Sequence, residues 1–498
     1  MSDFLGILCA VPSRQHSLAN TTDESYDRQL RDLLAQLKQP GLIPSTVDLN
    51  EHLEAVNPAI HSLSFLYLLR ARIQQLQKST KRDVPDGLLP GGSMWKHCVR
   101  FLRSFDPIQI RYAGHEWRQL VELLVTATLS CAKPVLAVKV VRDALIRINT
   151  SGVFTSMHLT LVKLALLSSS YTYALPVMDN LLCHFPTGMS LVHSESLLCS
   201  NHESNTTFLT DTSGFSLSLS YRDHLQFYLY SAMIYMALKK WDQASHCLSV
   251  VISSPTTNSV SKIMVEAYKK WVLANLLGHG KLFPTPSIVA PHVARVYQSL
   301  ARPYISLAEA FEKGGLQKLS AEVNIGHSIW RADNNSGLVH QVLEAYDKFM
   351  IIELGRTFSA LTMRDVLQRT SSCSKGPHDI EEFVVSLVLS DALTAATLSH
   401  ALSNENTALL RFSLSTQKHI FREEHIHARL LQWRCALNTI AEGIAQTDHT
   451  LELSQENLHF IARNQKWTGS AEKSGAPGPS EANASGDIDE DLMGDAHS

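Results

Sequence analysis

The sequence predicts a mainly α-helical protein in which an array of helical hairpins precedes a winged helix. Apolar residues recur three and four positions apart through most of the chain, and Pro and Gly mark short connections between these periodic stretches. Alternation with a period of two is confined to one region, residues 393–414. A chain of 498 residues exceeds one ordinary core, but a right-handed, tetratricopeptide-like repeat array can grow in one dimension.

Residues 1–195 are predicted to form an N-terminal helical-repeat region. Its clearest helices are expected at residues 26–37, 62–77, 115–131, 134–148 and 157–168. Short connections such as Pro40-Gly41 and Pro90-Gly91-Gly92 are typical of stacked helical hairpins. Residues 196–220 are rich in Ser, Thr and Asn and are too many for a tight turn, so we expect an exposed polar insertion there.

Residues 221–335 are predicted to continue the array as a tetratricopeptide-like part of the next domain. The first helix has apolar residues at i, i+3, i+4, i+7, i+8 and i+11, namely Leu225, Tyr228, Leu229, Ala232, Met233 and Met236. Its antiparallel partner carries Ala244, Leu248, Val251 and Ile252. A third helix from about Ser261 is expected to end at Gly278, a residue suited to a left-handed cap.

Residues 336–415 change character and are predicted to form the winged helix. A helix that stops at Gly355 precedes a short extended piece, and Thr362 with Asp365 suits the cap of the next helix. The helix over residues 379–390 and two strands, residues 393–398 and 410–414, complete the order helix, strand, helix, helix and hairpin. The core of this domain is expected from Val342, Tyr346, Phe383 and Leu387.

Residues 416–467 are predicted to form C-terminal helices that enter a bundle. Their apolar residues follow a heptad-like spacing, and we name this row the heptad seam: Ile426, Leu430, Trp433, Leu437, Ile440, Ile444, Leu451, Leu458 and Ile461. Such a row needs a partner helix. Residues 468–498 are rich in Gly, Pro, Ser and Ala with clustered acids, a composition that predicts a disordered acidic tail.

A search for chemistry finds no complete catalytic, metal or cofactor site in the sequence. His425 and His427, preceded by two glutamates, are the best metal candidates, but residues two apart diverge on a helix. Cys183, His184, His193, Cys199 and His202 crowd one region without the spacing of a zinc module. Gly87 and Gly92 have Walker spacing, but Ser93 replaces the lysine that would reach phosphates. We therefore expect no enzyme activity and no cofactor.

The charge balance favours partners recognised by shape. Lys plus Arg number 44 against 47 for Asp plus Glu, and the winged-helix segment 379–390 is acidic without Lys or Arg. Duplex binding needs several cations on that face, so no nucleic-acid partner is expected. Apolar stretches fall short of a membrane span, and eight scattered cysteines without a C-x-x-C pair indicate reduced thiols in an intracellular protein.

Several motifs resemble one known family. Residues 233–252, 261–270 and 276–281, together with Gln109 to Ala113 and Asp333 to Val339, are similar to PCI-domain subunits of the COP-nine signalosome. The resemblance covers residues 108–414 in register and is strongest between Tyr221 and Lys281. In the signalosome's own catalytic subunit, an Asp eleven residues beyond the second His follows a His-x-His pair, whereas this chain has Asn438 at that distance from His427.

The resemblance implies a structural role in a complex that removes the ubiquitin-like modifier Nedd from cullin-RING ubiquitin ligases. Catalysis would reside in another, metal-bearing subunit. It also implies association through winged-helix edges, here at Leu410, Phe412 and Leu414, and through the C-terminal bundle. Subunits one and eight would be neighbours, in the cytoplasm and nucleus.

Two other interpretations remain open from the sequence. PCI subunits of the proteasome lid or of translation initiation factor three share the predicted architecture. A metal-dependent hydrolase that uses His425 and His427 belongs to a different class and would require stoichiometric zinc.

Overall fold

The computed structural model shows a helical protein whose described strands form one three-stranded sheet. The chain divides into two compact units, Met1–Leu414 and Ser415–Ser498. The structure describes residues 2–14, 22–39, 49–148, 152–180, 182, 184–186, 197–200, 208–256, 260–370, 377–389, 393, 396–400, 408–412, 423–452, 457–459 and 461.

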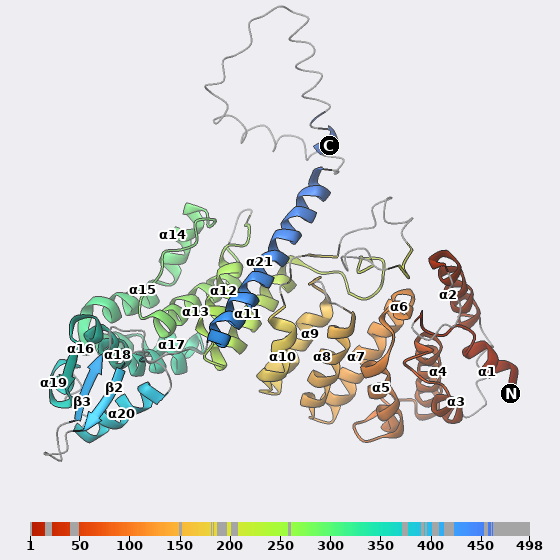
Figure 1. The fold of residues 1–498 in the computed structure, drawn as a ribbon, viewed down its shortest axis with the longest axis horizontal. Coiled ribbons are helices and arrows are strands. Elements are labelled where there is room, and N and C mark those ends of the chain that lie inside the picture. The colour runs from red at the N-terminus through yellow and green to blue at the C-terminus, as the bar shows by residue number, and fades with distance from the viewer. Residues whose placement is uncertain are drawn as a thin grey trace, which may run out of the picture. The chain divides into compact units, whose positions relative to one another are not determined.

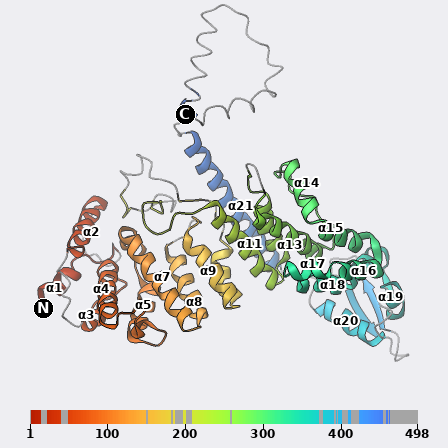
Figure 2. The same cartoon turned by 180° about the vertical axis from the view of Figure 1, so that it is seen from behind.

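The first helices of the larger unit lie side by side in sequence order (Figures 1 and 2). Their bounds are α1 (Ser2–Leu8), α2 (Asp23–Leu37), α3 (Asn50–Ala55), α4 (Ser62–Thr80), η2 (Asp86–Leu88), α5 (Ser93–Ser104), α6 (Pro107–Ile110), η3 (Arg111–Ala113), α7 (Gly114–Ser130), α8 (Pro134–Ile148), α9 (Ser156–Leu167) and α10 (Tyr171–Met178). Helix α8 contacts α5, α7 and α9, and α9 contacts α11, as expected for a repeat array. The predicted helix over 134–148 coincides with α8.

The array continues through the second set of helices. Their bounds are α11 (Tyr221–Ala237), α12 (Trp241–Ile252), α13 (Lys262–His279), α14 (Pro291–Leu300), α15 (Arg302–Glu309), the π-helical turn η6 (Ala310–Gly314), α16 (Gly315–Ile325), α17 (His327–Ala332) and α18 (Ser336–Thr357). Ser220 and Asp223 start α11 with a capping box, in which the Asp223 carboxylate accepts from the Ser220 amide at 3.0 Å. Helix α11 packs against α12 and α12 against α13, and the three-residue connection between α11 and α12 fits the predicted hairpin.

The predicted winged helix is present at the end of the larger unit. Its elements are β1 (Ala360–Thr362), α19 (Met363–Arg369), α20 (Pro377–Leu389), β2 (Ala396–His400) and β3 (Ala408–Phe412). All pairs are antiparallel, and the strand order is β1-β3-β2. The hydroxyl of Thr362 accepts from the Asp365 amide at 3.2 Å and caps α19, as predicted.

Three apolar cores follow one another along the larger unit. Helix α11 belongs to the first two cores, because Phe227 and Ile234 face the N-terminal helices whereas Leu229 faces α12 and α13. Helix α18 belongs to the second and third cores. In a repeat array each repeat packs against its neighbours, and helices that contribute to two cores are consistent with this arrangement.

The expected composition of the winged-helix core is partly wrong. Val342 and Tyr346 pack in the second core, with Tyr346 against Phe311, whereas the sheet packs on the later turns of α18 through Ile351. Leu387 does belong to the winged-helix core. Helix α18 is 22 residues long, and its first half packs in the second core whereas its second half packs in the third. Helical periodicity does not show at which residue the helix passes from one core to the next.

The end of α13 also differs from the prediction. The helix continues to His279, and Gly280 rather than Gly278 takes the left-handed conformation, with φ of 69°. A Cβ atom at Gly278 would lie 2.7 Å from Cβ of Trp241, so this glycine allows the close approach of α12 to α13. Both glycines suit a cap, and the packing contact decides between them.

The expectation of an exposed insertion over residues 196–220 is only partly correct for the described residues 197–200 and 208–220, which we name the strap. Asp211, Thr212 and Leu217 are exposed, but other strap residues are buried. Four of its side chains are buried in the first core: Cys199, Phe208, Leu209 and Phe215. The Arg111 guanidinium donates to the carbonyls of Leu198 at 2.8 Å and Ser200 at 2.9 Å. The Ser, Thr and Asn content of this stretch predicted exposure, because composition averages over the few apolar residues that are buried.

A glycine contact secures the second part of the strap. Gly114 at the start of α7 lies against the Ser213 carbonyl, where a Cβ atom would approach the oxygen to 2.4 Å. The Arg118 side chain donates to the Gly214 carbonyl at 2.9 Å, and the Ser216 hydroxyl accepts from the Ser156 amide at 2.9 Å. The strap therefore contacts both α7 and α9.

The smaller unit contains α21 (Glu423–Glu452), a helix of 30 residues. Residues 468–498, where the sequence predicts a disordered tail, lie outside the described residues. No helix in the described part of the chain combines the length and apolar character needed to cross a bilayer.

Candidate interaction surfaces

The heptad seam lies along α21 and presents large apolar side chains to solvent in the smaller unit. Exposed fractions are 54% for Leu430, 55% for Trp433, 66% for Leu437, 40% for Ile440, 57% for Ile444 and 59% for Leu451. Leu458 and Ile461, beyond α21, are 52% and 42% exposed. Ile426 lies on the helix, but its side chain is outside the described set. Residues at this spacing share one side of a helix, so the described seam residues of α21, from Leu430 to Leu451, form one apolar stripe.

This stripe is suited to packing against other helices. Full burial of each Leu or Ile is worth about 1.5–3 kcal/mol, so several such residues supply enough free energy for specific association. Exposed apolar rows of this kind are typical of protein interaction sites.

The sheet contradicts one predicted interaction surface. Leu410 and Phe412 lie on β3, the central strand, and Leu410 is paired with Leu361 on one side and Leu398 on the other. Leu410 is fully buried, so the prediction that these residues form an open sheet edge is wrong. Leu414 is outside the described residues. Alternation with a period of two predicts a strand but not its place in the sheet.

The edge strands of the described sheet are β1 and β2. In the described sheet β2 and β1 are the outer strands, each paired only with β3. β2 is the longer, with five residues against three in β1. Sheet extension by a partner strand would therefore occur most readily at Ala396–His400.

Of the histidine pair, the structure describes the side chain of His427 and not that of His425. Glu423 to His427 occupy the first turns of α21, and the side chain of His427 is exposed. Positions two apart on a helix point in widely different directions. Across the described residues, no cluster of three or more His, Cys, Asp or Glu side chains suits a metal ion.

Of the Cys and His residues that crowd residues 183–202, the described ones have structural contacts. The His184 carbonyl accepts from the Phe154 amide at 2.8 Å, and the Cys199 thiol donates to the Asp23 carbonyl at 3.1 Å. Burial raises the pKa of Cys199, which disfavours the thiolate that metal binding needs. Cys183, His193 and His202 lie outside the described residues.

The glycines with Walker spacing have a packing role. A Cβ atom at Gly92 would lie 2.2 Å from the Gly87 carbonyl oxygen, so the two glycines pack directly against each other before α5. This close approach explains the spacing without a phosphate ligand.

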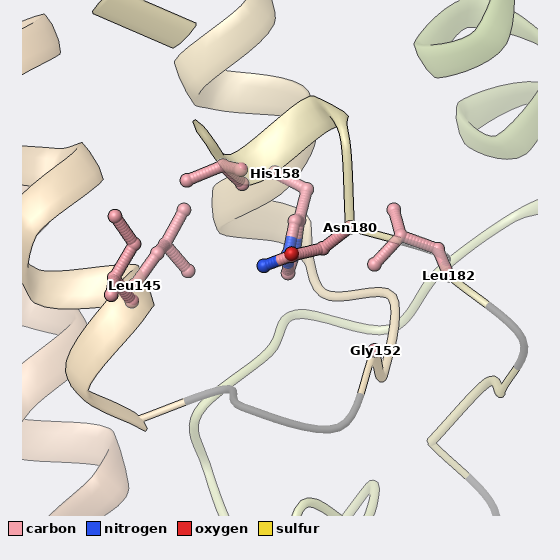
Figure 3. A pocket seen from close by; sticks show the side chains of 7 residues that line it. Leu145, Gly152, His158, Asn180 and Leu182 are labelled. Carbon is pink, nitrogen blue, oxygen red and sulfur yellow. The ribbon is translucent and has the colours of Figure 1, made fainter. Parts of the chain in front are cut away.

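His158 is a buried histidine that the sequence did not single out. Its Nδ1 accepts from the Thr155 amide at 3.1 Å and completes the capping box of α9. Figure 3 shows His158 and Asn180 pointing into one small cavity of about 10 Å³, which has room for about one water molecule. Burial lowers the pKa of His158 to about 4, so its ring is neutral at pH 7. This cavity is too small for a substrate.

The fold and these surfaces define a class of protein: a helical-repeat and winged-helix chain whose C-terminal helix carries an exposed row of apolar residues. Comparison with known proteins identifies the family. Residues 24–293 match the family model described as COP9 signalosome complex subunit 3, N-terminal helical repeats. The chain belongs to this signalosome subunit 3 family.

Individual relatives support the assignment along most of the chain. The chain is 68% identical over 495 residues to the COP9 signalosome complex subunit 3 of Emericella nidulans, an alignment that covers 99% of this chain and all of the relative. Proteins of the same name from Neurospora crassa and Dictyostelium discoideum are 25% and 24% identical. These alignments cover 75% and 69% of this chain, and 74% and 73% of the relatives.

Proposed function

We propose that this chain is a non-catalytic scaffold subunit of the signalosome. The complex would remove the ubiquitin-like modifier Nedd from cullin-RING ubiquitin ligases, with catalysis in a different, metalloprotease subunit. The exposed heptad seam of α21 carries this proposal, because a solvated row of Leu and Ile is unfavourable until a partner helix covers it.

Two surfaces would connect the chain to other signalosome subunits. The heptad seam would enter a helical bundle, and the β2 edge at Ala396–His400 would extend a sheet. Subunits one and eight are the expected neighbours, and cullin-RING ligases would be indirect partners. We expect the complex in the cytoplasm and nucleus.

Family membership favours the signalosome over the proteasome lid and translation initiation factor three. Affinity purification of the tagged chain, followed by identification of the chains that co-purify in stoichiometric amounts, tests this choice. Recovery of proteasome-lid or initiation-factor subunits in place of signalosome subunits would contradict the proposal.

A separate assay tests the absence of catalysis. The purified chain, free of other subunits, should not release Nedd from a neddylated cullin. The variant His425→Ala with His427→Ala is the control. Turnover that this variant abolishes, together with stoichiometric bound zinc, would assign the chain to metal-dependent hydrolases.

A further inference from the structure

Two adjacent hollows lie beside the turn that leads into α18, and we name them together the Asp333 groove. The first, of about 460 Å³, has Val260, Val265 and Leu300 in its lining. The second, of about 380 Å³, is lined by the apolar residues Met233, Met236 and Leu338 among others. Glu266, Asp333 and Asn334 line both hollows, so an apolar region lies on each side of a polar centre.

The polar centre is held by a connected set of hydrogen bonds. Lys269 donates to both carboxylate oxygens of Asp333, at 2.8 and 2.7 Å, and the Tyr304 hydroxyl donates to Asp333 at 2.8 Å. Lys270 donates to Glu266 at 2.9 Å and to Asn335 at 3.1 Å. Both carboxylates in the groove are thus matched by lysines of α13. The network fixes the turn, so the groove is largely formed before any ligand binds.

Two further lysines leave the groove with excess positive charge. Lys239 lines the second hollow and Lys262 lines the first, and both side chains are exposed. Neither lysine forms an ion pair with any residue that the structure describes. The charge of Lys239 also acts on Lys348, whose pKa is lowered first by burial and further by this neighbouring charge.

We propose that the Asp333 groove binds an acidic peptide segment of a partner protein that also carries large apolar side chains. Apolar side chains would enter the two hollows, and carboxylates would pair with Lys239 and Lys262. Two cations without a matching carboxylate in the groove are too few for stable binding of a phosphate backbone, which favours a peptide over a nucleic acid. This inference does not depend on the proposed role in the signalosome.

A binding assay with the full-length chain tests the proposal. The probe is the fluorescein-labelled synthetic peptide Glu-Leu-Asp-Glu-Met-Leu-Asp-Glu, followed by fluorescence anisotropy at low and at physiological salt. Lys239→Glu with Lys262→Glu should weaken binding by about tenfold or more and reduce its salt dependence, because two attractive charges become repulsive. Lys78→Glu with Lys96→Glu makes the same change of net charge at exposed lysines of α4 and α5 and should leave affinity unchanged.

A second pair of variants tests the contribution of apolar contacts to peptide binding. Leu300→Ser should weaken peptide binding several-fold, because Leu300 lines the first hollow and is 55% exposed. Ile288→Ser removes a more exposed apolar side chain, 79% exposed, that does not line the groove and should have no effect. Circular dichroism of each variant checks that folding is retained.

A photo-reactive amino acid at Gln341, which lines the second hollow, should crosslink to the peptide, whereas the same amino acid at Gln74 on α4 should not.

Equal affinity for a peptide with Ser in place of Leu and Met would overturn the proposal, because it would mean that the groove recognises negative charge alone. Tighter binding of single-stranded RNA than of the peptide, or no loss of affinity on Lys239→Glu with Lys262→Glu, would also overturn it.

Discussion

At the scale of single residues, burial keeps the imidazole ring of His158 neutral. The ring is almost completely buried, and its Nδ1 is used as a hydrogen-bond acceptor by the capping box of α9. Protonation would remove that acceptor and place a charge in an apolar surrounding. Since the pKa is lowered to about 4 from the ordinary value near 6.5, the folded state holds this histidine neutral where an unfolded chain would protonate it.

We predict a pH dependence of stability that His158 causes in part. The stabilising contribution is complete above about pH 6.5 and is lost as the pH falls towards 4, because the unfolded state then binds a proton that the folded state does not. The loss between pH 7 and pH 5 should be about 2 kcal/mol. Hydrogen exchange of α8 and α9 amides, corrected for intrinsic rates, measures the local stability at both pH values.

His158→Gln is the matched variant, because a Gln at this position can still accept from the Thr155 amide without titrating. The variant should retain the helix start and show a shallower decline of stability. His61, His97 and His224 have pKa values lowered by burial as well, so some decline remains. Equal declines in variant and wild type would show that His158 contributes nothing to the pH dependence.

Among the helices and strands, α21 is the element on which assembly should depend. Leu437 and Ile440 lie in the middle of the heptad seam and are 66% and 40% exposed. Replacing both by Asp removes about 1.5–3 kcal/mol of transfer free energy for each residue and buries charge in any interface. We predict that this double variant no longer co-purifies with other signalosome subunits in a quantitative pull-down.

The control places the same charges on the opposite side of α21. Ala428→Asp with His449→Asp changes two exposed positions away from the heptad seam and should leave recovery unchanged. Circular dichroism should change little for both variants, because the winged-helix core is formed by residues such as Ile351, Val384 and Leu387, which neither variant changes. Unimpaired recovery of partners by the seam variant, Leu437→Asp with Ile440→Asp, would mean that the seam does not mediate assembly.

Across the whole molecule, stability is distributed over three connected cores. Each core shares a helix with the next, through α11 or α18, and the strap adds contacts to α7 and α9 within the first core. Repeat arrays built in this way gain stability from neighbouring contacts along the chain. Segments that supply no buried apolar residues should contribute little.

We predict that removal of residues 468–498 leaves thermal stability unchanged. The composition of this segment, Gly, Pro, Ser and Ala with clustered acids, provides too little apolar surface to offset the entropy of ordering it. Differential scanning calorimetry of truncated and full-length chains measures the effect. A clear drop in the melting temperature of the truncated chain would contradict the prediction.

Local sequence patterns were sufficient to predict the helical array, the winged helix and a C-terminal helix, because each depends on a local periodicity. The period of 3.6 residues predicted α8 to the residue, and Thr362 with Asp365 predicted the cap of α19. Family motifs between Tyr221 and Lys281 also predicted the signalosome family, which the comparison confirmed.

Tertiary contacts, by contrast, determine which elements share a core and which strand lies at the margin of the sheet. Leu410 and Phe412 were predicted to form an edge but lie on the central strand, and Val342 and Tyr346 pack away from the winged-helix core. The strap has exposed residues, as predicted, but four of its side chains are buried in the first core. The Asp333 groove likewise joins residues of α11, α13 and α18 that are far apart in sequence. Periodicity describes one element at a time, whereas these outcomes depend on contacts between distant segments that no local pattern encodes.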